Sequence, residues 1–104
     1  MLAAISNFEN ININNRVLIL GDMFELGEYS DQEHQKIVDF VTNKDYSKVY
    51  LVGDNFSKCN TDGEYFFKFS NTDEIAQSDS FKSLKNMNIL VKGSRGVSLE
   101  KLFI

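Results

Sequence analysis

Charged side chains of both signs follow three apolar runs of the sequence, at residues 16–20, 48–52 and 88–92, and each run ends in a glycine-bearing turn. In a parallel sheet these turns gather on one edge. The carboxylates of Asp22, Glu25 and Asp54 would then lie beside the cations of Lys92 and Arg95. Such a rim suits a zwitterionic or amide substrate, because cations bind carboxylates and acids bind ammonium groups. The alternative is that the glycines only permit tight turns and that the charges are solvated.

Of the three turns, the one at residues 21–27 indicates a functional site most specifically. Asp22 comes directly after an apolar run, where it could orient a ligand or cap backbone N–H groups. Exposing the apolar side chains of Phe24 and Leu26 to water would be unfavourable, so we expect them to be packed and the loop to be ordered.

A helix is predicted at about residues 31–43, because Ser30 and Glu33 spell a capping box. His34 falls on or beside the apolar stripe of this helix, which contains Ile37, Val38 and Val41. A lone histidine in such a place is more often a hydrogen-bonded structural group than a catalyst.

Composition narrows the class of protein. The 104 residues fit one domain, and a hydrophobic content of 42% can fill a core. The net charge of -4 argues against nucleic-acid binding, which needs a clustered basic face. No apolar run approaches the roughly 18 residues of a membrane span, and the N-terminus lacks the features of a signal peptide. We therefore expect a cytoplasmic protein. The lone Cys59 cannot form an internal disulfide and is expected to be an inert thiol, and no Cys/His spacing suggests zinc.

The remaining pattern alternates strands with helices, which favours an α/β fold with a mostly parallel sheet of about four strands, covered by helices on both faces. Residues 65–69 form an aromatic strand that Lys68 places nearer the sheet edge. Helical segments are expected at residues 1–9, 54–60, 72–84 and from about 98. The inward-facing candidates of the 72–84 helix are Ile75, Ala76, Phe81 and Leu84.

Phosphate-binding motifs are missing. The stretch Lys92-Gly93-Ser94-Arg95-Gly96 does not match the G-x-x-x-x-G-K-[ST] loop, and no G-x-G-x-x-G follows a strand. A polar rim without a phosphate cradle is best interpreted as one wall of a shared site.

Two segments carry a family resemblance: Leu20-Gly21-Asp22-Met23-Phe24-Glu25-Leu26-Gly27 with His34 downstream, and Val91-Lys92-Gly93-Ser94-Arg95-Gly96 followed by Leu99-Glu100. They closely resemble the C-terminal domain of the Mur ligases. Within that family they are most similar to the members that add D-alanyl-D-alanine to UDP-N-acetylmuramoyl-tripeptide. The resemblance covers roughly residues 1–103. It implies a Rossmann-like three-layer domain of an ATP-dependent, cytoplasmic amide ligase of peptidoglycan synthesis. The resemblance also implies that ATP and Mg²⁺ act in the full-length enzyme, whose central domain holds the P-loop and whose N-terminal domain holds the UDP-sugar.

The resemblance implies substrate-binding residues in both segments. Asp22, Met23, Glu25 and His34 would face the cleft between domains. Lys92, Ser94 and Arg95 would form the neighbouring wall, which would meet the dipeptide carboxylate or the muramoyl peptide. No catalytic residue and no metal ligand are implied. Residues 1–104 would be one C-terminal-type domain without the family's first strand and without its two preceding domains. Such a fragment is expected to be inactive alone and to bind no ATP tightly.

A rival interpretation is a free-standing flavodoxin-like or receiver-like domain, whose acidic turn would hold a metal ion or a partner. Asp22, Asp54 and Lys92 loosely match a receiver site. Against it, no acidic pair lies near the start of the chain, and the 21–27 turn has no role in such a site. A third possibility is an interaction domain without a site of its own.

Overall fold

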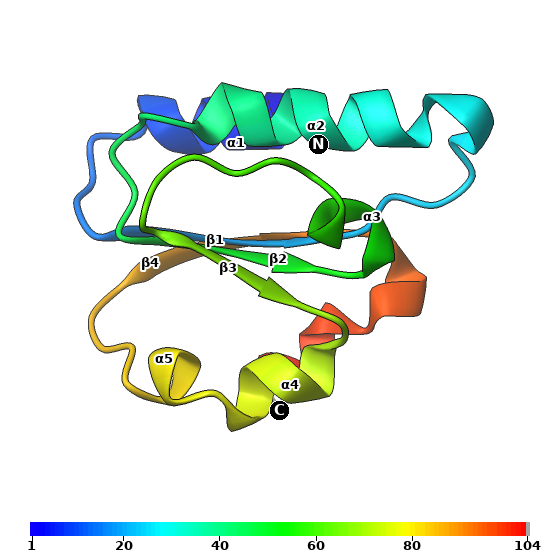
Figure 1. Cartoon of the computed structure of the whole chain (residues 1–104). Coiled ribbons are helices and arrows are strands. Elements are labelled where there is room, and N and C mark those ends of the chain that lie inside the picture. Colours follow the sequence, from blue (N-terminus) through cyan, green and yellow to red (C-terminus); the bar gives the residue numbers. More distant parts are fainter. Residues whose placement is uncertain (104) are drawn as a thin grey trace.

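The computed structural model describes residues 1–103, except for the side chain of Arg95. Four parallel strands form one sheet in the order β3-β2-β1-β4. Their bounds are β1 (Arg16–Gly21), β2 (Lys48–Val52), β3 (Phe66–Phe69) and β4 (Asn88–Lys92). Helices cover both faces of this sheet (Figure 1), so the predicted α/β class with a parallel sheet is confirmed.

The two central strands are β1 and β2. They pair in register from Val17 opposite Lys48 to Gly21 opposite Val52, and every residue after the first of each strand is buried. Continuous apolar runs are what a strand needs when both of its faces are covered. The edge strand β3 exposes Lys68, as predicted from its interrupted apolar pattern.

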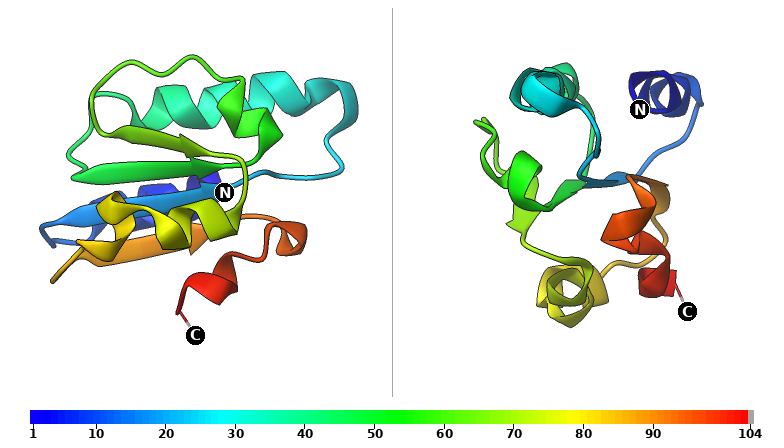
Figure 2. Two further views of the ribbon diagram at one scale, coloured as in Figure 1. Left: turned by 60° about the horizontal axis from the view of Figure 1, so that its bottom comes forward. Right: turned by 90° about the vertical axis from the view of Figure 1, so that its right-hand side faces the viewer.

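Helices α1 (Leu2–Asn10), α2 (Ser30–Val41) and α3 (Asp54–Ser57) cover one face, as Figure 1 shows above the sheet. The core beneath them contains Ile5, Phe8, Leu18, Leu20, Ile37, Val38, Val41, Val49, Leu51 and Phe56. The other face carries α4 (Thr72–Gln77), α5 (Asp79–Lys82) and the 3₁₀ turn η3 (Leu99–Phe103). Its core contains Val17, Ile19, Tyr50, Val52, Ile75 and Leu99. Figure 2 (right) shows these two layers on opposite sides of the sheet.

Two local predictions were wrong, and a third differs in helix type. The predicted 72–84 helix is two short helices, because Ser78 is extended and caps α5 by accepting a hydrogen bond from the Phe81 N–H. Consequently Ala76 is exposed, although Ile75 is buried and both Phe81 and Leu84 pack partly against the core. The predicted capping box at Ser30 and Glu33 does not form, because a 3₁₀ turn, η1 (Gly27–Tyr29), leads directly into α2. The closing helix is present as predicted, at Leu99–Phe103, but as a 3₁₀ helix.

The strand order reverses between β1 and β4, which makes the gap between their carboxyl ends the switch point of the sheet. Ligands of open α/β sheets bind at such points. Among the described strands, the order 3-2-1-4 matches the first four positions of the doubly wound order 3-2-1-4-5-6, and it differs from the 2-1-3 start of flavodoxin-like sheets. Within residues 1–103, no helix is long and apolar enough to cross a membrane.

Candidate functional site at the carboxyl edge of the sheet

Two turns meet at the switch point: the acidic turn (residues 22–27, after β1) and the basic turn (residues 92–95, at the end of β4). The Ser94 N–H donates to the backbone oxygen of Asp22 over 3.1 Å, and the Phe24 N–H donates to Ser94 Oγ over 2.9 Å. A Cβ atom on Gly93 would lie 2.9 Å from the Cα of Gly21, so a glycine permits this close approach. The predicted gathering of these turns on one edge is confirmed.

Asp22 is 4% exposed and joins the acidic turn to the turn after β2. Its carboxylate accepts hydrogen bonds from the backbone N–H groups of Asn55 and Phe56, each over 2.9 Å. Gly53 has a φ of 115°, and a Cβ there would lie 2.3 Å from the Asp22 Cγ. Of the two interpretations of Asp22, the structure displays the capping of backbone N–H groups.

His34 is fully buried and fixes the next residue of the turn. Its Nε2 accepts the Met23 N–H over 3.0 Å, and its Nδ1 lies 2.6 Å from the backbone oxygen of Ser30. Because Nε2 accepts and the carbonyl needs a donor, the ring is the neutral tautomer with its proton on Nδ1. The ring edge packs against Phe56, with centroids 4.6 Å apart. This is the hydrogen-bonded structural histidine expected from its place in the sequence.

Phe24 and Glu25 form the outer part of the acidic turn. Phe24 is 49% exposed, so the expected packing of this side chain is only half realised. Glu25 is exposed and has a φ of 66°, in the left-handed region that non-glycine residues rarely adopt. Unlike Asp22 and His34, these two residues are exposed, Phe24 by about half.

All four strand ends line a hollow of about 220 Å³, here called the inner hollow. Its lining residues are Asp22, Phe24, Gly53, Asp54, Ser70, Asn71, Gly96 and Val97. The contribution of Ser70 and Asn71, which follow β3, was missed by sequence reasoning. A signal for that turn exists, because Asn71 and Glu74 have capping-box spacing. The Asn71 Oδ1 accepts the Glu74 N–H over 3.0 Å, and the Glu74 carboxylate accepts the Ser70 N–H.

Lys92 and Ser94 line a second hollow of about 340 Å³ beside β4, here called the outer hollow. Its other lining residues are Val91, Gly93, Leu99, Glu100 and Phe103. The predicted site residues therefore fall into two groups. Asp22, Met23 and His34 hold the acidic turn, and Glu25 is exposed on it. Lys92 and Ser94 line the outer hollow. The side chain of Arg95 lies outside the described part of the chain.

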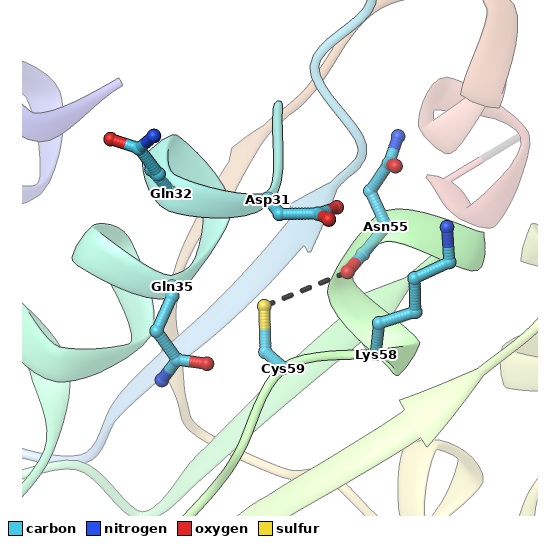
Figure 3. Close-up of a pocket in the computed structure, with 6 residues that line it drawn as sticks. All are labelled: Asp31, Gln32, Gln35, Asn55, Lys58 and Cys59. Carbon is cyan, nitrogen blue, oxygen red and sulfur yellow. Dashed lines mark hydrogen bonds between the residues drawn. The ribbon is translucent and has the colours of Figure 1, made fainter. Parts of the chain in front are cut away.

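Cys59 lies at a third hollow, of about 330 Å³, between α2 and α3 (Figure 3). The other lining residues are Asp31, Gln32, Gln35, Asn55 and Lys58. The thiol is buried and faces the backbone oxygen of Asn55 at 3.6 Å. Burial raises the pKa of Cys59, so the thiolate is disfavoured near neutral pH. An unreactive thiol is the consequence.

Nothing in the described edge fits a triphosphate or a metal ion by itself. The N-terminal N–H groups of α3, which would be the natural phosphate contacts at this edge, are taken by the Asp22 carboxylate. Residues 1–103 contain no group of three or more His, Cys, Asp or Glu side chains placed to hold a metal ion. The described edge is therefore a polar surface whose α3 N–H groups are already used within the chain.

Sequence comparison identifies relatives along almost the whole chain. The UDP-N-acetylmuramoyl-tripeptide–D-alanyl-D-alanine ligase of Rickettsia prowazekii is 33% identical over 108 residues, covering 98% of this chain. The ligase of the same name from Buchnera aphidicola is 32% identical over 105 residues, with the same coverage. The resemblance to the Mur ligases is confirmed. The chain spans only 23% of the length of each of these Mur ligases. No family model matches the chain.

A solved structure supports the Mur ligase fold. It is described as MurF ligase from Thermotoga maritima in complex with ADP, and it matches 86% of this chain and 21% of its own. The TM-score is 0.65 and the sequence identity is 20%. At that identity the likeness concerns the fold, and it agrees with the Rossmann-like domain that the sequence motifs imply.

Proposed function

We propose that the chain is the C-terminal, substrate-closing domain of a ligase that adds D-alanyl-D-alanine to UDP-N-acetylmuramoyl-tripeptide in peptidoglycan synthesis. Relatives of that description match 98% of the chain at 32% and 33% identity, which supports the proposal. The reaction would take place in the cytoplasm and would use ATP and Mg²⁺ held by parts of a longer protein. The 104 residues alone would be inactive, because their described edge has no phosphate cradle.

The observation that carries the proposal is the hydrogen-bonded meeting of the two turns at the switch point. Ser94 Oγ accepts the Phe24 N–H, which leaves the hydroxyl proton of Ser94 free to donate to a ligand. Lys92 lines the same outer hollow. An ammonium and a hydroxyl donor suit a carboxylate, and D-alanyl-D-alanine ends in one. Arg95 would supply a second cation to this wall.

The acidic turn would contribute a negative charge to the same wall. Asp22, Met23 and His34 hold its backbone, and Glu25 presents an exposed carboxylate, which suits an ammonium group. Closure of this domain over the rest of the ligase would bring the dipeptide amine to the peptide carboxylate and exclude water. The function of the chain would therefore be positioning.

The test is Lys92→Ala in the full-length ligase that contains this chain. Loss of one charge-assisted contact should raise the KM for D-alanyl-D-alanine about tenfold, with the KM for ATP unchanged. Lys82→Ala is the matched control, because Lys82 is an exposed lysine on α5, outside both hollows. An unchanged KM for the dipeptide, or an equal rise for ATP, would refute the assigned contact.

A further inference from the structure

We propose that Phe24 is a positioning residue, whose ring couples the acidic turn to the turn at residues 93–97. The ring lies directly on the backbone of Gly96: a Cβ atom added to Gly96 would be 2.5 Å from Phe24 Cε2 and 3.4 Å from Cδ2 and Cζ. Any side chain at residue 96 would therefore push the ring away. Gly96 has no positive φ, so contact with Phe24, and not backbone conformation, is what favours glycine at this position.

Hydrogen bonds place the 93–97 turn between two supports. On one side, the Phe24 N–H donates to Ser94 Oγ, and the Ser94 N–H donates to the backbone oxygen of Asp22. On the other side, the Thr72 hydroxyl at the start of α4 donates to the backbone oxygen of Val97 over 2.6 Å. The Val97 N–H closes the turn on the backbone oxygen of Ser94. The ring of Phe24 lies where the first support meets the turn.

The ring is not needed for the core. Phe24 is half exposed and belongs to neither core cluster, so its removal should leave the sheet and its two layers intact. The next residue, Glu25, has a left-handed backbone that costs a non-glycine residue about 1 kcal/mol. An exposed aromatic ring beside a strained residue is an arrangement that local contacts must hold in place.

The consequence concerns Lys92 and Ser94. Ser94 lies in the turn that Phe24 supports, whereas Lys92 is the last residue of β4. The position of Ser94 in the outer hollow therefore depends on a side chain that does not itself line that hollow. That Lys92 and Ser94 meet a substrate rests on the proposed function. The coupling of the two turns does not, and it can be tested on the 104-residue chain alone.

The experiment is a double-mutant cycle of Phe24→Ala and Gly96→Ala, read by amide hydrogen exchange at Ser94 and Val97, whose N–H groups hold the turn. Each single variant should speed exchange at both amides by about tenfold or more, because the ring is deleted in one and displaced in the other. The double variant should exchange no faster than Phe24→Ala, because the added methyl group then has no ring to displace. Additive effects, or no effect of Gly96→Ala, would overturn the coupling.

Two further variants separate coupling from general loosening. Ile11→Ala removes another exposed apolar side chain, 51% exposed, outside the acidic and 93–97 turns, and it should leave both amides unchanged. Phe24→Leu keeps an apolar group over Gly96 and should leave the Ser94 and Val97 amides more protected than Phe24→Ala does. In the full-length ligase, Phe24→Ala should raise the KM for D-alanyl-D-alanine and not that for ATP. A positive cycle without this kinetic effect would leave the coupling standing and count against the proposed function.

Discussion

Within the acidic turn, Asp22 is buried and the backbone of Met23 is hydrogen-bonded, while the side chains of Phe24 and Glu25 are exposed. The Asp22 carboxylate is used by two backbone N–H groups and the Met23 N–H by His34. The Phe24 ring is half exposed and Glu25 is exposed in a left-handed conformation. Residues of one short motif therefore differ in what they can do. The inner ones stabilise the edge, and the proposed contacts with a ligand fall to Glu25 and to the basic turn.

The largest effect that this comparison predicts is on the free energy of unfolding, at the buried residue Asp22. Asp22→Ala removes the acceptor of the Asn55 and Phe56 N–H groups in a buried place. It should lower the free energy of unfolding by about 2–4 kcal/mol, because both donors lose their partner. Urea unfolding monitored by circular dichroism measures this effect. Asp54→Ala, at an exposed carboxylate of the same hollow, should cost less than about 1 kcal/mol. Equal losses of unfolding free energy in the two variants would contradict the structural role assigned to Asp22.

His34→Phe tests the second inner contact. Phenylalanine keeps a ring beside Phe56 but loses both the acceptor for the Met23 N–H and the donor to Ser30. We expect a loss of about 1–3 kcal/mol in unfolding free energy. In the unmodified chain, nitrogen NMR should find the imidazole proton on Nδ1. A proton on Nε2 would contradict the assigned hydrogen bond from Met23.

Sequence patterns predicted the parts of the fold that depend on residues close together in the chain. The runs in β1 and β2 are apolar throughout, which is sufficient to identify strands buried on both faces. The parallel arrangement then brings the strand-end turns to one edge. Contacts such as that between Phe24 and Ser94, which are 70 residues apart, could not be predicted, since they depend on how strands β1 and β4 are placed.

The two capping-box patterns explain why local prediction also failed in places. Ser30 and Glu33 have the same spacing as Asn71 and Glu74. Asn71 is extended, with φ −151° and ψ 170°, so its side chain reaches the Glu74 N–H. Ser30 already has helical angles, because η1 delivers the chain to it in a turn, and its hydroxyl lies 3.4 Å from His34 Nδ1. Whether a capping box forms depends on the backbone conformation at its first residue, and the two residue types of the pattern do not specify that conformation.

The smallest predicted effect concerns the outer half, at Glu25. Asparagine adopts the left-handed region more readily than glutamate, and unlike glycine it adds little freedom to the unfolded chain. Glu25→Asn should therefore raise the free energy of unfolding by about 0.5–1 kcal/mol, whereas Glu25→Ala should leave it nearly unchanged, since alanine is strained there too. Denaturation midpoints at equal m-values measure both. If Glu25→Asn also raises the KM for D-alanyl-D-alanine in the full-length ligase, the strained carboxylate is kept for a ligand contact. If stability rises and the kinetics do not change, Glu25 makes no such contact. The proposed ligand contacts are then left to the basic turn, which carries Lys92 and Ser94.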